Sequence, residues 1–552
     1  MRDLLAALQE RVRSAPSSPF CHFLAQNRQT TFTVAQTWER SARFARLYRA
    51  RGLGRGDVVA IILRHEPDLY FAFLGALLAR CIPTFMPFPS SKQDPARYWA
   101  QHRTLFSRIG LKAVVTYRNN ATEMRNFCPE PQILMPEQAR ELNCEWEPTH
   151  VNAEDIAFLQ HSSGTTGLKK GVLLSYGAVS AQIERYSAAL QLDARDVIVS
   201  WLPLYHDMGL IACFILPLMS GAALVSLDAF EWVARPRLLF EAIERYRGTH
   251  VWLPNFAFHH LCRTVQSRPS LELSSLRAII DCSEPCRSES LEQFVSSFGR
   301  FGIRRDDLRV CYAMAETVFA VTQTPAGRSV GTLLLNEEAL WSGRIEPGGA
   351  SGAGHRVVSV GAPLPDVDIK IVNDEGGEVD GSRVGQVAVR APFLFSGYHN
   401  DPELTARKLR DGWYFTGDVG FVHSGELYLL GRVDDLLIIN GRNLMAHDVE
   451  YAINSEVDEI KTGRCIALGV YSEEVGSQEL VVVAELSGEA APPQLSRRVK
   501  SAVLNGCGIL PKEVKIVPPG WLAKSTSGKI ARELNLSRYL DMKRSLEAGG
   551  TE

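Results

Sequence analysis

The residues with the clearest chemical potential form a glycine-rich stretch, "HSSGTTGLKKG", at positions 161–171. It holds three glycines, four hydroxyl side chains and two adjacent lysines. Glycines let backbone amides approach an anion closely, hydroxyl groups donate hydrogen bonds, and lysine adds positive charge. A solvated turn would explain the glycines and serines, but not their density beside paired lysines. The composition therefore favours a phosphate-binding loop.

The segments on either side of this loop have the composition of β-strands. "DIAFLQ" (155–160) precedes it and "GVLLS" (171–175) follows, so we expect a long hairpin. The strand-to-helix pattern of kinases and ATPases, G-x-x-x-x-G-K followed by Ser or Thr, is absent, which argues against an ADP-releasing enzyme. The groups expected to contact phosphate are Ser162, Ser163, Gly164, Thr165, Thr166, Gly167 and Lys170.

Length and composition are those of a globular protein with more than one domain. The chain has 552 residues, which is too many for a single core. It is 45% hydrophobic and 22% charged, and its formal net charge is -2. This balance gives no reason to expect a nucleic-acid or membrane-surface partner.

The cysteines and apolar segments indicate a cytoplasmic, reduced protein. Eleven cysteines are scattered along the chain, and Cys282 and Cys286 lack a second Cys or His pair at zinc spacing, so we expect inert thiols. The N-terminal 16 residues form an amphipathic helix without the apolar core of a signal peptide. "IACFILPLMSGAALVSL" (211–227) is the most apolar segment, but it contains Pro217 and is expected to be a buried helix followed by a strand. No apolar run reaches the roughly 18 residues of a membrane span.

The order of predicted elements gives an α/β fold. Between residues 30 and 400, buried strands such as "DVVAIIL" (57–63) and "LKAVVTY" (111–117) alternate with helical segments such as 66–80. From about 355 to 431, short strands separated by Gly, Asp and Asn turns predict an antiparallel β subdomain. We expect a large N-terminal domain (1–431), a polar hinge (432–436) and a small mobile α+β C-terminal domain (437–552).

Five further stretches, taken with the glycine-rich loop, resemble the adenylate-forming superfamily of acyl-CoA synthetases, fatty acyl-AMP ligases, adenylation domains and luciferases. They follow the loop in the family's order and span nearly the whole chain. They are "SWLPLYHDMGL" (200–210), "CYAMAET" (311–317), "DGWYFTGDVG" (411–420), "GRVDDLLIINGRNLMAHDVE" (431–450) and "LAKSTSGKIAR" (522–532).

The resemblance implies a reaction in two halves. A carboxylate attacks the α-phosphorus of ATP to give an acyl-adenylate and pyrophosphate. The thiol of CoA, or of the phosphopantetheine arm of an acyl carrier protein, then displaces AMP. Because the first half brings two anions together, screening by cations and by Mg²⁺ is its main catalytic need.

The resemblance also implies roles for individual residues. Lys529 matches the adenylation lysine that bridges the substrate carboxylate and the α-phosphate; without the motif it would be taken for a surface lysine. Glu316 matches the magnesium ligand, although a solvated glutamate at a helix start is the plain alternative. Thr317 should contact the α-phosphate, and Tyr312 should stack on adenine.

A second group of residues should bind the ribose, allow the domain movement and line the pocket for the carboxylic acid substrate. Asp418 should accept hydrogen bonds from both ribose hydroxyls, with help from Arg432. Asp434 falls at the hinge, and Gly441 should line the thiol tunnel after rotation. His206 matches a gate beside the acyl pocket, with a core histidine as the alternative. The segments 253–261 and 281–285 should line that pocket.

The expected thiol acceptor depends on which branch of the superfamily the chain most resembles. Segments 200–211, 234–258 and 335–347 resemble the fatty acyl-AMP ligases, which favours an acyl carrier protein. Asp434 stands where that branch often has lysine, and Ala313 replaces a frequent glycine, so free CoA remains an alternative acceptor. A non-catalytic protein that binds a nucleotide or an acyl-adenylate should lack the adenylation lysine or the magnesium-binding carboxylate, whereas Lys529, Glu316 and Asp418 are all present.

Overall fold

The protein is described from a computed structural model. The structure describes residues 3–26, 28–89, 95–147, 150–162, 170–265, 271–348, 354–373, 375–439, 442–473, 475–488, 491–524 and 530–548.

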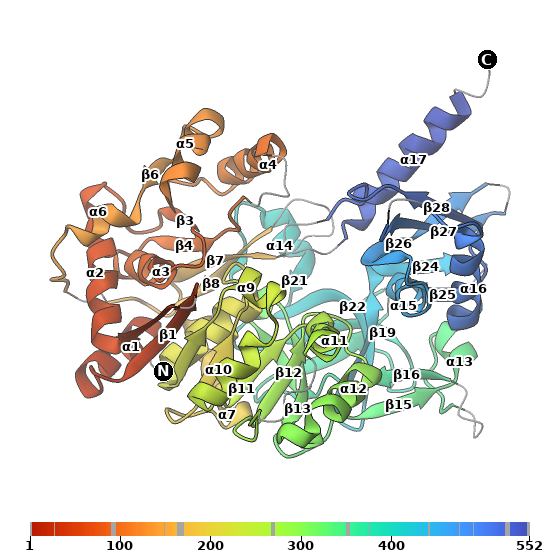
Figure 1. The fold of residues 1–552 in the computed structure, drawn as a ribbon, viewed down its shortest axis with the longest axis horizontal. Coiled ribbons are helices and arrows are strands. Elements are labelled where there is room, and N and C mark those ends of the chain that lie inside the picture. The colour runs from red at the N-terminus through yellow and green to blue at the C-terminus, as the bar shows by residue number, and fades with distance from the viewer. Residues whose placement is uncertain are drawn as a thin grey trace.

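The largest sheet of the fold has nine strands in the order β17-β14-β13-β12-β11-β9-β10-β1-β2. Its strands β1, β11, β12 and β13 are labelled in Figure 1. Its strands are β1 (Pro19–Ala25), β2 (Arg28–Thr33), β9 (Val197–Ser200), β10 (Ala223–Ser226), β11 (His250–Leu253), β12 (Ala278–Cys282), β13 (Leu308–Ala313), β14 (Ala320–Gln323) and β17 (Ala362–Pro363). The six strands from β13 to β1 are parallel. Strands β11 and β12 are buried at every position, as expected for a parallel sheet covered on both faces.

A second parallel sheet lies in the N-terminal part of the chain, in the order β4-β3-β5-β6. Its strands are β3 (Val58–Ile62), β4 (Ile82–Phe85), β5 (Ala113–Thr116) and β6 (Gln132–Leu134). β3 and β5 confirm the strands predicted at 57–63 and 111–117, and α3 (Asp68–Leu78) confirms the helix predicted between them.

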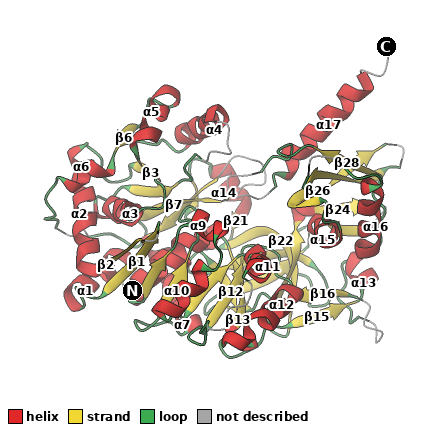
Figure 2. Ribbon diagram, in the orientation of Figure 1, coloured by secondary structure: helices red, strands yellow, loops and turns green. Residues whose placement is uncertain are grey.

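Helices surround these sheets (Figure 2). In the N-terminal part they are α1 (Leu4–Ser14), α2 (Val34–Ala50), α3, α4 (Pro95–Arg108), α5 (Arg118–Phe127), α6 (Pro136–Arg140), α7 (Tyr176–Leu190), α8 (Leu216–Ser220), α9 (Ala229–Ala234), α10 (Leu238–Tyr246), α11 (Asn255–Thr264), α12 (Ser288–Phe298), α13 (Glu337–Trp341) and α14 (Pro402–Lys408). The α/β fold class predicted from the sequence is therefore confirmed.

Smaller antiparallel sheets carry most of the candidate site. The loop-bearing hairpin β7 (Ile156–Ser162) and β8 (Lys170–Ser175) is joined by β20 (Gly397–Tyr398). The predicted β-rich region contains β18 (Asp368–Val372), β19 (Gly385–Arg390), β21 (Leu409–Arg410), β22 (Trp413–His423) and β23 (Glu426–Arg432) in one sheet, and β15 (Thr332–Leu335) pairs with β16 (His355–Val358).

The C-terminal segment has a sheet and a core of its own, coloured blue in Figure 1. Its strands are β24 (Leu436–Ile439), β25 (Arg442–Met445), β26 (Ile460–Ser472), β27 (Ser477–Leu486) and β28 (Glu513–Val517), and its helices are α15 (Ala446–Glu456), α16 (Leu495–Cys507) and α17 (Arg532–Ala548). The hydrophobic cluster under α15 and α16 is separate from the N-terminal core. Mobility of this part and a hinge at 432–436 stay predictions.

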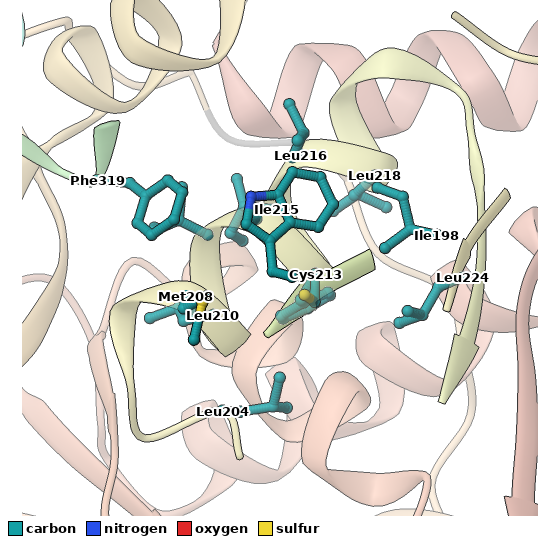
Figure 3. Packing of buried hydrophobic residues seen from close by; sticks show 14 of the residues in the cluster. Ile198, Leu204, Met208, Leu210, Cys213, Ile215, Leu216, Leu218, Leu224 and Phe319 are labelled. Carbon is teal, nitrogen blue, oxygen red and sulfur yellow. The ribbon is translucent and has the colours of Figure 1, made fainter. Parts of the chain in front are cut away.

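The apolar segment after His206 forms a π-helix, η1 (Met208–Ile215), which runs into α8 and β10. Figure 3 shows Met208, Leu210, Cys213 and Ile215 among other buried hydrophobic residues, including Ile198 of β9 and Leu224 of β10. This confirms the buried helix followed by a strand. The sequence did not indicate the wider π-type winding, which often occurs at functional sites.

Candidate active site

The glycine-rich loop begins and ends on a hairpin, as predicted. β7 and β8 pair antiparallel, with Ser162 opposite Lys170. Ser163, Gly164, Thr165, Thr166 and Gly167 lie outside the described residues, as does the side chain of Ser162. Lys170 closes the loop, and its ammonium group lies 5.7 Å from the ring centroid of Tyr398.

Glu316 is held at the end of β13 by a partner that the sequence did not indicate. It lies in a short 3-10 turn, η4 (Ala315–Thr317), and is only 7% exposed. The Tyr398 hydroxyl donates to Glu316 Oε1 at 2.8 Å, and the Phe395 amide donates to the Glu316 carbonyl at 2.8 Å. Burial and the Glu316 charge raise the pKa of Tyr398, so its hydroxyl stays protonated and remains a donor.

The surroundings of Glu316 fit a magnesium ion that is shared with a substrate. Within the described residues, no three His, Cys, Asp or Glu side chains cluster closely enough to hold a metal. Mg²⁺ is usually bound by one or two carboxylates together with waters and substrate phosphates. One fixed carboxylate beside a phosphate-type loop matches that arrangement better than it matches an all-protein metal cage.

The residues that follow Glu316 have strained backbone geometry. Val318 has φ 62°, in a region that a β-branched residue rarely adopts. The Thr317 side chain is fully buried, and its hydroxyl donates to the Phe319 carbonyl at 2.8 Å. Contact of Thr317 with the α-phosphate stays a prediction, because this hydroxyl already has a backbone acceptor. Strain of this kind is found mainly at functional sites.

The predicted ribose residues come together across three strands. Asp418 of β22 lies opposite Arg432 of β23, with Arg432 Nε 3.4 Å from Asp418 Oδ1. The Tyr312 hydroxyl at the end of β13 donates to Asp418 Oδ2, and the Asp418 amide donates to Thr416 Oγ1 at 2.9 Å. Burial and the Asp418 charge raise the pKa of Tyr312, so this donor also stays protonated. The stacking of Tyr312 on adenine stays a prediction.

His206 precedes the π-helix in a tightly packed turn. Its ring lies 4.8 Å from the Tyr205 ring, and its side chain is partly exposed. The Asp207 carboxylate accepts from the Met208 amide at 2.8 Å and so fixes the start of η1. At Gly209, a Cβ atom would lie 2.2 Å from the Pro203 carbonyl oxygen, so only glycine fits. The role of His206 as a gate stays a prediction.

The two predicted pocket segments are joined by buried hydrogen bonds. Asn255, the first residue of α11, donates to Asp281 Oδ2 at 2.8 Å at the end of β12. Ser290 donates to the Asn255 side-chain oxygen at 3.1 Å, and the Phe256 amide donates to Glu284 at 2.9 Å. Burial raises the pKa of Asp281 well above its usual range, which favours the neutral form of this side chain. The network fixes the two segments to each other.

The hinge residue and the C-terminal residues are only partly described. Asp434 is exposed in the 3-10 turn η5 (Val433–Asp435). Its neighbour Asp435 pairs with Arg532 at 2.8 Å, and Arg532 also pairs with Glu450 at 2.7 Å. Lys529 and Gly441 lie outside the described residues.

A contact that sequence reasoning missed joins the pocket segment to the C-terminal segment. Arg287, two residues beyond "DCSEP", pairs with Asp448 of α15 at 2.9 Å, and its guanidinium lies 3.9 Å from the Tyr451 ring centroid. Burial opposes ionisation of Asp448, but the charges of His447, Arg287 and His355 lower its pKa below the ordinary value. No motif contains both residues, so only their meeting in space identifies them.

We predict that this ion pair holds the C-terminal segment in its present orientation. Asp448→Arg should place two cations together and remove roughly 1.5–3 kcal/mol of interaction. Trypsin should then cleave the 432–436 segment several-fold faster than in the wild type, because the segment is released more often. The exchanged pair Arg287→Asp/Asp448→Arg should restore the wild-type rate. Asp368→Arg is the matched control, since its pair with Arg390 is exposed; equal acceleration by this control would refute the prediction.

Comparison with known proteins now places the chain in a family. A family model described as AMP-binding enzyme matches residues 8–399. The chain belongs to this family. The predicted class of this AMP-binding enzyme, an AMP-forming acyl-adenylate ligase, is thereby confirmed.

Three proteins that are similar to this chain show which kinds of ligase it resembles. The medium-chain fatty acid–acyl carrier protein ligase JamA of Moorena producens is 31% identical over 418 residues, covering 72% of this chain and 70% of JamA. A putative acyl-CoA synthetase of Caulobacter vibrioides is 31% identical over 514 residues, covering 90% and 88%. A solved structure from a study of fatty acyl-adenylate ligases from E. coli and L. pneumophila has a TM-score of 0.91 at 25% identity, covering 99% of both chains.

The structure adds one observation on membranes. Within the part of the chain that it describes, none of the helices combines the length and apolar character needed to cross a bilayer.

Proposed function

We propose that this AMP-binding enzyme activates a fatty or other acyl or aryl carboxylic acid with ATP and Mg²⁺. It releases pyrophosphate and then passes the acyl group to the phosphopantetheine thiol of an acyl carrier protein. We further propose that it acts in the cytoplasm.

One observation carries the proposal: a single strand, β13, leads to both acidic groups that a nucleotide would need. Tyr312 near its end bonds to Asp418, which is suited to the ribose hydroxyls. Four residues further along, Glu316 is fixed by Tyr398 beside the phosphate-type loop. A sugar-binding carboxylate and a metal-binding carboxylate are thus held in one rigid frame, as an ATP site requires.

In the first half-reaction, a carboxylate oxygen of the acid forms a bond to the α-phosphorus. The bond from that phosphorus to the bridging oxygen breaks, and its electron pair leaves with pyrophosphate. Bound Mg²⁺ would neutralise charge on the phosphate oxygens while Glu316 holds it. Lys529 supplies the cation between the two reacting anions, and Asp418 with Arg432 fixes the ribose.

In the second half-reaction, a thiol sulfur bonds to the acyl carbon, the bond to AMP breaks, and the thiol proton passes to solvent. The carrier protein is favoured by the similarity to JamA. The alternative acceptor, free CoA, is favoured by Asp434, which stands where the carrier-dependent branch often has lysine, and by the Caulobacter relative.

The deciding experiment incubates the purified protein with ATP, Mg²⁺ and a panel of carboxylic acids, and follows pyrophosphate and AMP release. CoA and a phosphopantetheinylated carrier protein are supplied separately, with the unmodified carrier as the matched control. Thioester formed only with the modified carrier supports the proposal. Thioester formed with free CoA makes the protein an acyl-CoA synthetase, and ADP release contradicts both assignments.

A further prediction tests the hinge. Asp434→Pro should fix φ within η5 and so resist rotation of the C-terminal segment. Adenylation should be retained, while transfer to the thiol should fall about tenfold or more, because the second half-reaction needs the other orientation. The two half-reactions are measured separately, and Asp434→Ala serves as the matched control. Unchanged overall turnover of Asp434→Pro would refute the hinge assignment.

A further inference from the structure

Helix α14 presents a lysine to the site that no recognised motif contains. Lys408 is the last residue of this helix. The helix is fixed at its start, where Asp401 accepts from the Leu404 amide at 3.1 Å and pairs with Arg108 at 2.5 Å. The position of Lys408 therefore follows from a well-anchored helix.

The face of α14 that carries Lys408 packs against the residues around Glu316. Thr405, three residues earlier and hence on the same face, accepts from the Tyr398 amide at 2.9 Å. Tyr398 in turn donates to Glu316. Lys408 is half-buried on this side, whereas its neighbour Arg407 is exposed.

The Lys408 ammonium group lies beside the backbone of the ribose-binding turn. Its Nζ atom lies 3.4 Å from the point where a Cβ on Gly417 would stand, and Arg432 Nη2 lies 3.7 Å from the same point. Gly417 has φ 84°, a conformation that residues with a side chain rarely adopt, and both cations lie at ordinary contact distance from it. Two cations therefore converge next to Asp418.

The positive charge of the Lys408 ammonium is not fully balanced by the negative charges around it. Burial lowers its pKa, and the like charges of Lys170 and Arg432 lower it further, against the opposing charges of Asp434 and Glu316. Asp418 is already bound by Tyr312 and Arg432, and Glu316 by Tyr398. Within the part of the chain that the structure describes, the Lys408 ammonium makes no hydrogen bond or ion pair. An anionic ligand would supply the missing charge.

We propose that Lys408 binds the terminal phosphates of ATP and holds pyrophosphate as it leaves. This rests on the proposed function. The adenosine side of the site is served by Asp418 and Arg432. Lys408 lies on the helix face whose Thr405 contacts Tyr398, and the Tyr398 ring lies 5.7 Å from the Lys170 ammonium at the end of the phosphate-type loop. Lysine suits such a role, because its compact charge can follow a phosphate that moves.

Isothermal titration with three probes tests the proposal: MgATP, inorganic pyrophosphate with Mg²⁺, and AMP. Lys408→Met should weaken binding of MgATP and of pyrophosphate by about tenfold or more, because a charge-assisted contact is lost. Binding of AMP, which lacks those phosphates, should stay within about twofold. Lys408→Arg should recover most of the loss, and Arg407→Met on the exposed face is the matched control. The midpoint of thermal unfolding checks that each variant is folded, with Lys408→Gln as the substitute if Lys408→Met is not.

Three results would overturn the assignment. Unchanged MgATP affinity in Lys408→Met would show that the lysine contacts no phosphate. Equal weakening of AMP would move the contact to the ribose or the α-phosphate. Slower thiol transfer from a supplied acyl-adenylate, with MgATP affinity intact, would make Lys408 a hinge tether through Asp434. A wild-type protein that binds none of the three probes would instead refute the proposed function itself.

Discussion

Replacing Lys529 with alanine is expected to lower the rate of adenylation by about 10²-fold or more. Two anions, the substrate carboxylate and the α-phosphate, must approach each other, and Lys529 is the cation that we propose acts between them. The loss should appear in acid-dependent pyrophosphate release at saturating ATP. It should appear mainly in kcat, because this interaction strengthens as the new bond forms.

The same variant should spare the second half-reaction. Thioester formation from a supplied acyl-adenylate should continue at nearly the wild-type rate, since rotation would have carried Lys529 away from the nucleotide. Lys524 offers a matched control in the same segment, because it is an exposed lysine that feels the charges of Arg464 and Glu485 in the C-terminal part. Equal loss of both half-reactions in Lys529→Ala would show that the lysine does not have the assigned role.

Glu316→Gln should have the second large effect, about 10²-fold on adenylation. Glutamine has nearly the same shape and can still accept the hydrogen bond from Tyr398, so the fold of the turn should survive. It lacks the negative charge that a hard cation requires. The Mg²⁺ concentration needed for half-maximal pyrophosphate release should therefore rise in the variant.

Magnesium titration separates this role from a structural one. Tyr398→Phe removes only the hydroxyl that holds Glu316, and should give a smaller loss with the same direction of change in Mg²⁺ dependence. A Glu316→Gln variant with reduced turnover but an unchanged Mg²⁺ requirement would contradict the metal assignment. It would leave Glu316 as a residue that shapes the strained turn before Val318.

Local sequence patterns predicted the elements that frame the site. The apolar run at 57–63 became β3, because a strand buried on both faces needs no polar alternation. The strands flanking the glycine-rich loop became the β7–β8 hairpin. These predictions depended on near neighbours in the chain, which is where periodicity and turn residues carry information. The order of motifs added the family, and with it Glu316, Asp418 and Lys529.

The contacts that give those residues their chemical state required the tertiary structure. Tyr312 was expected only to stack on adenine, yet its hydroxyl bonds to Asp418, 106 residues away. Tyr398, which holds Glu316 from 82 residues away, belongs to no motif used in the sequence analysis.

The sequence by itself determined the fold class, and it predicted the phosphate-type loop and the acidic and basic residues suited to adenylate chemistry. The tertiary structure decided which charged residues are already paired, as Arg287 is with Asp448, and which cations lie near the predicted ribose residues, as Lys408 does beside Gly417. The physical reason is that hydrogen bonding, burial and charge compensation depend on distances between strands and helices. Those distances are fixed only when segments remote in the chain pack together.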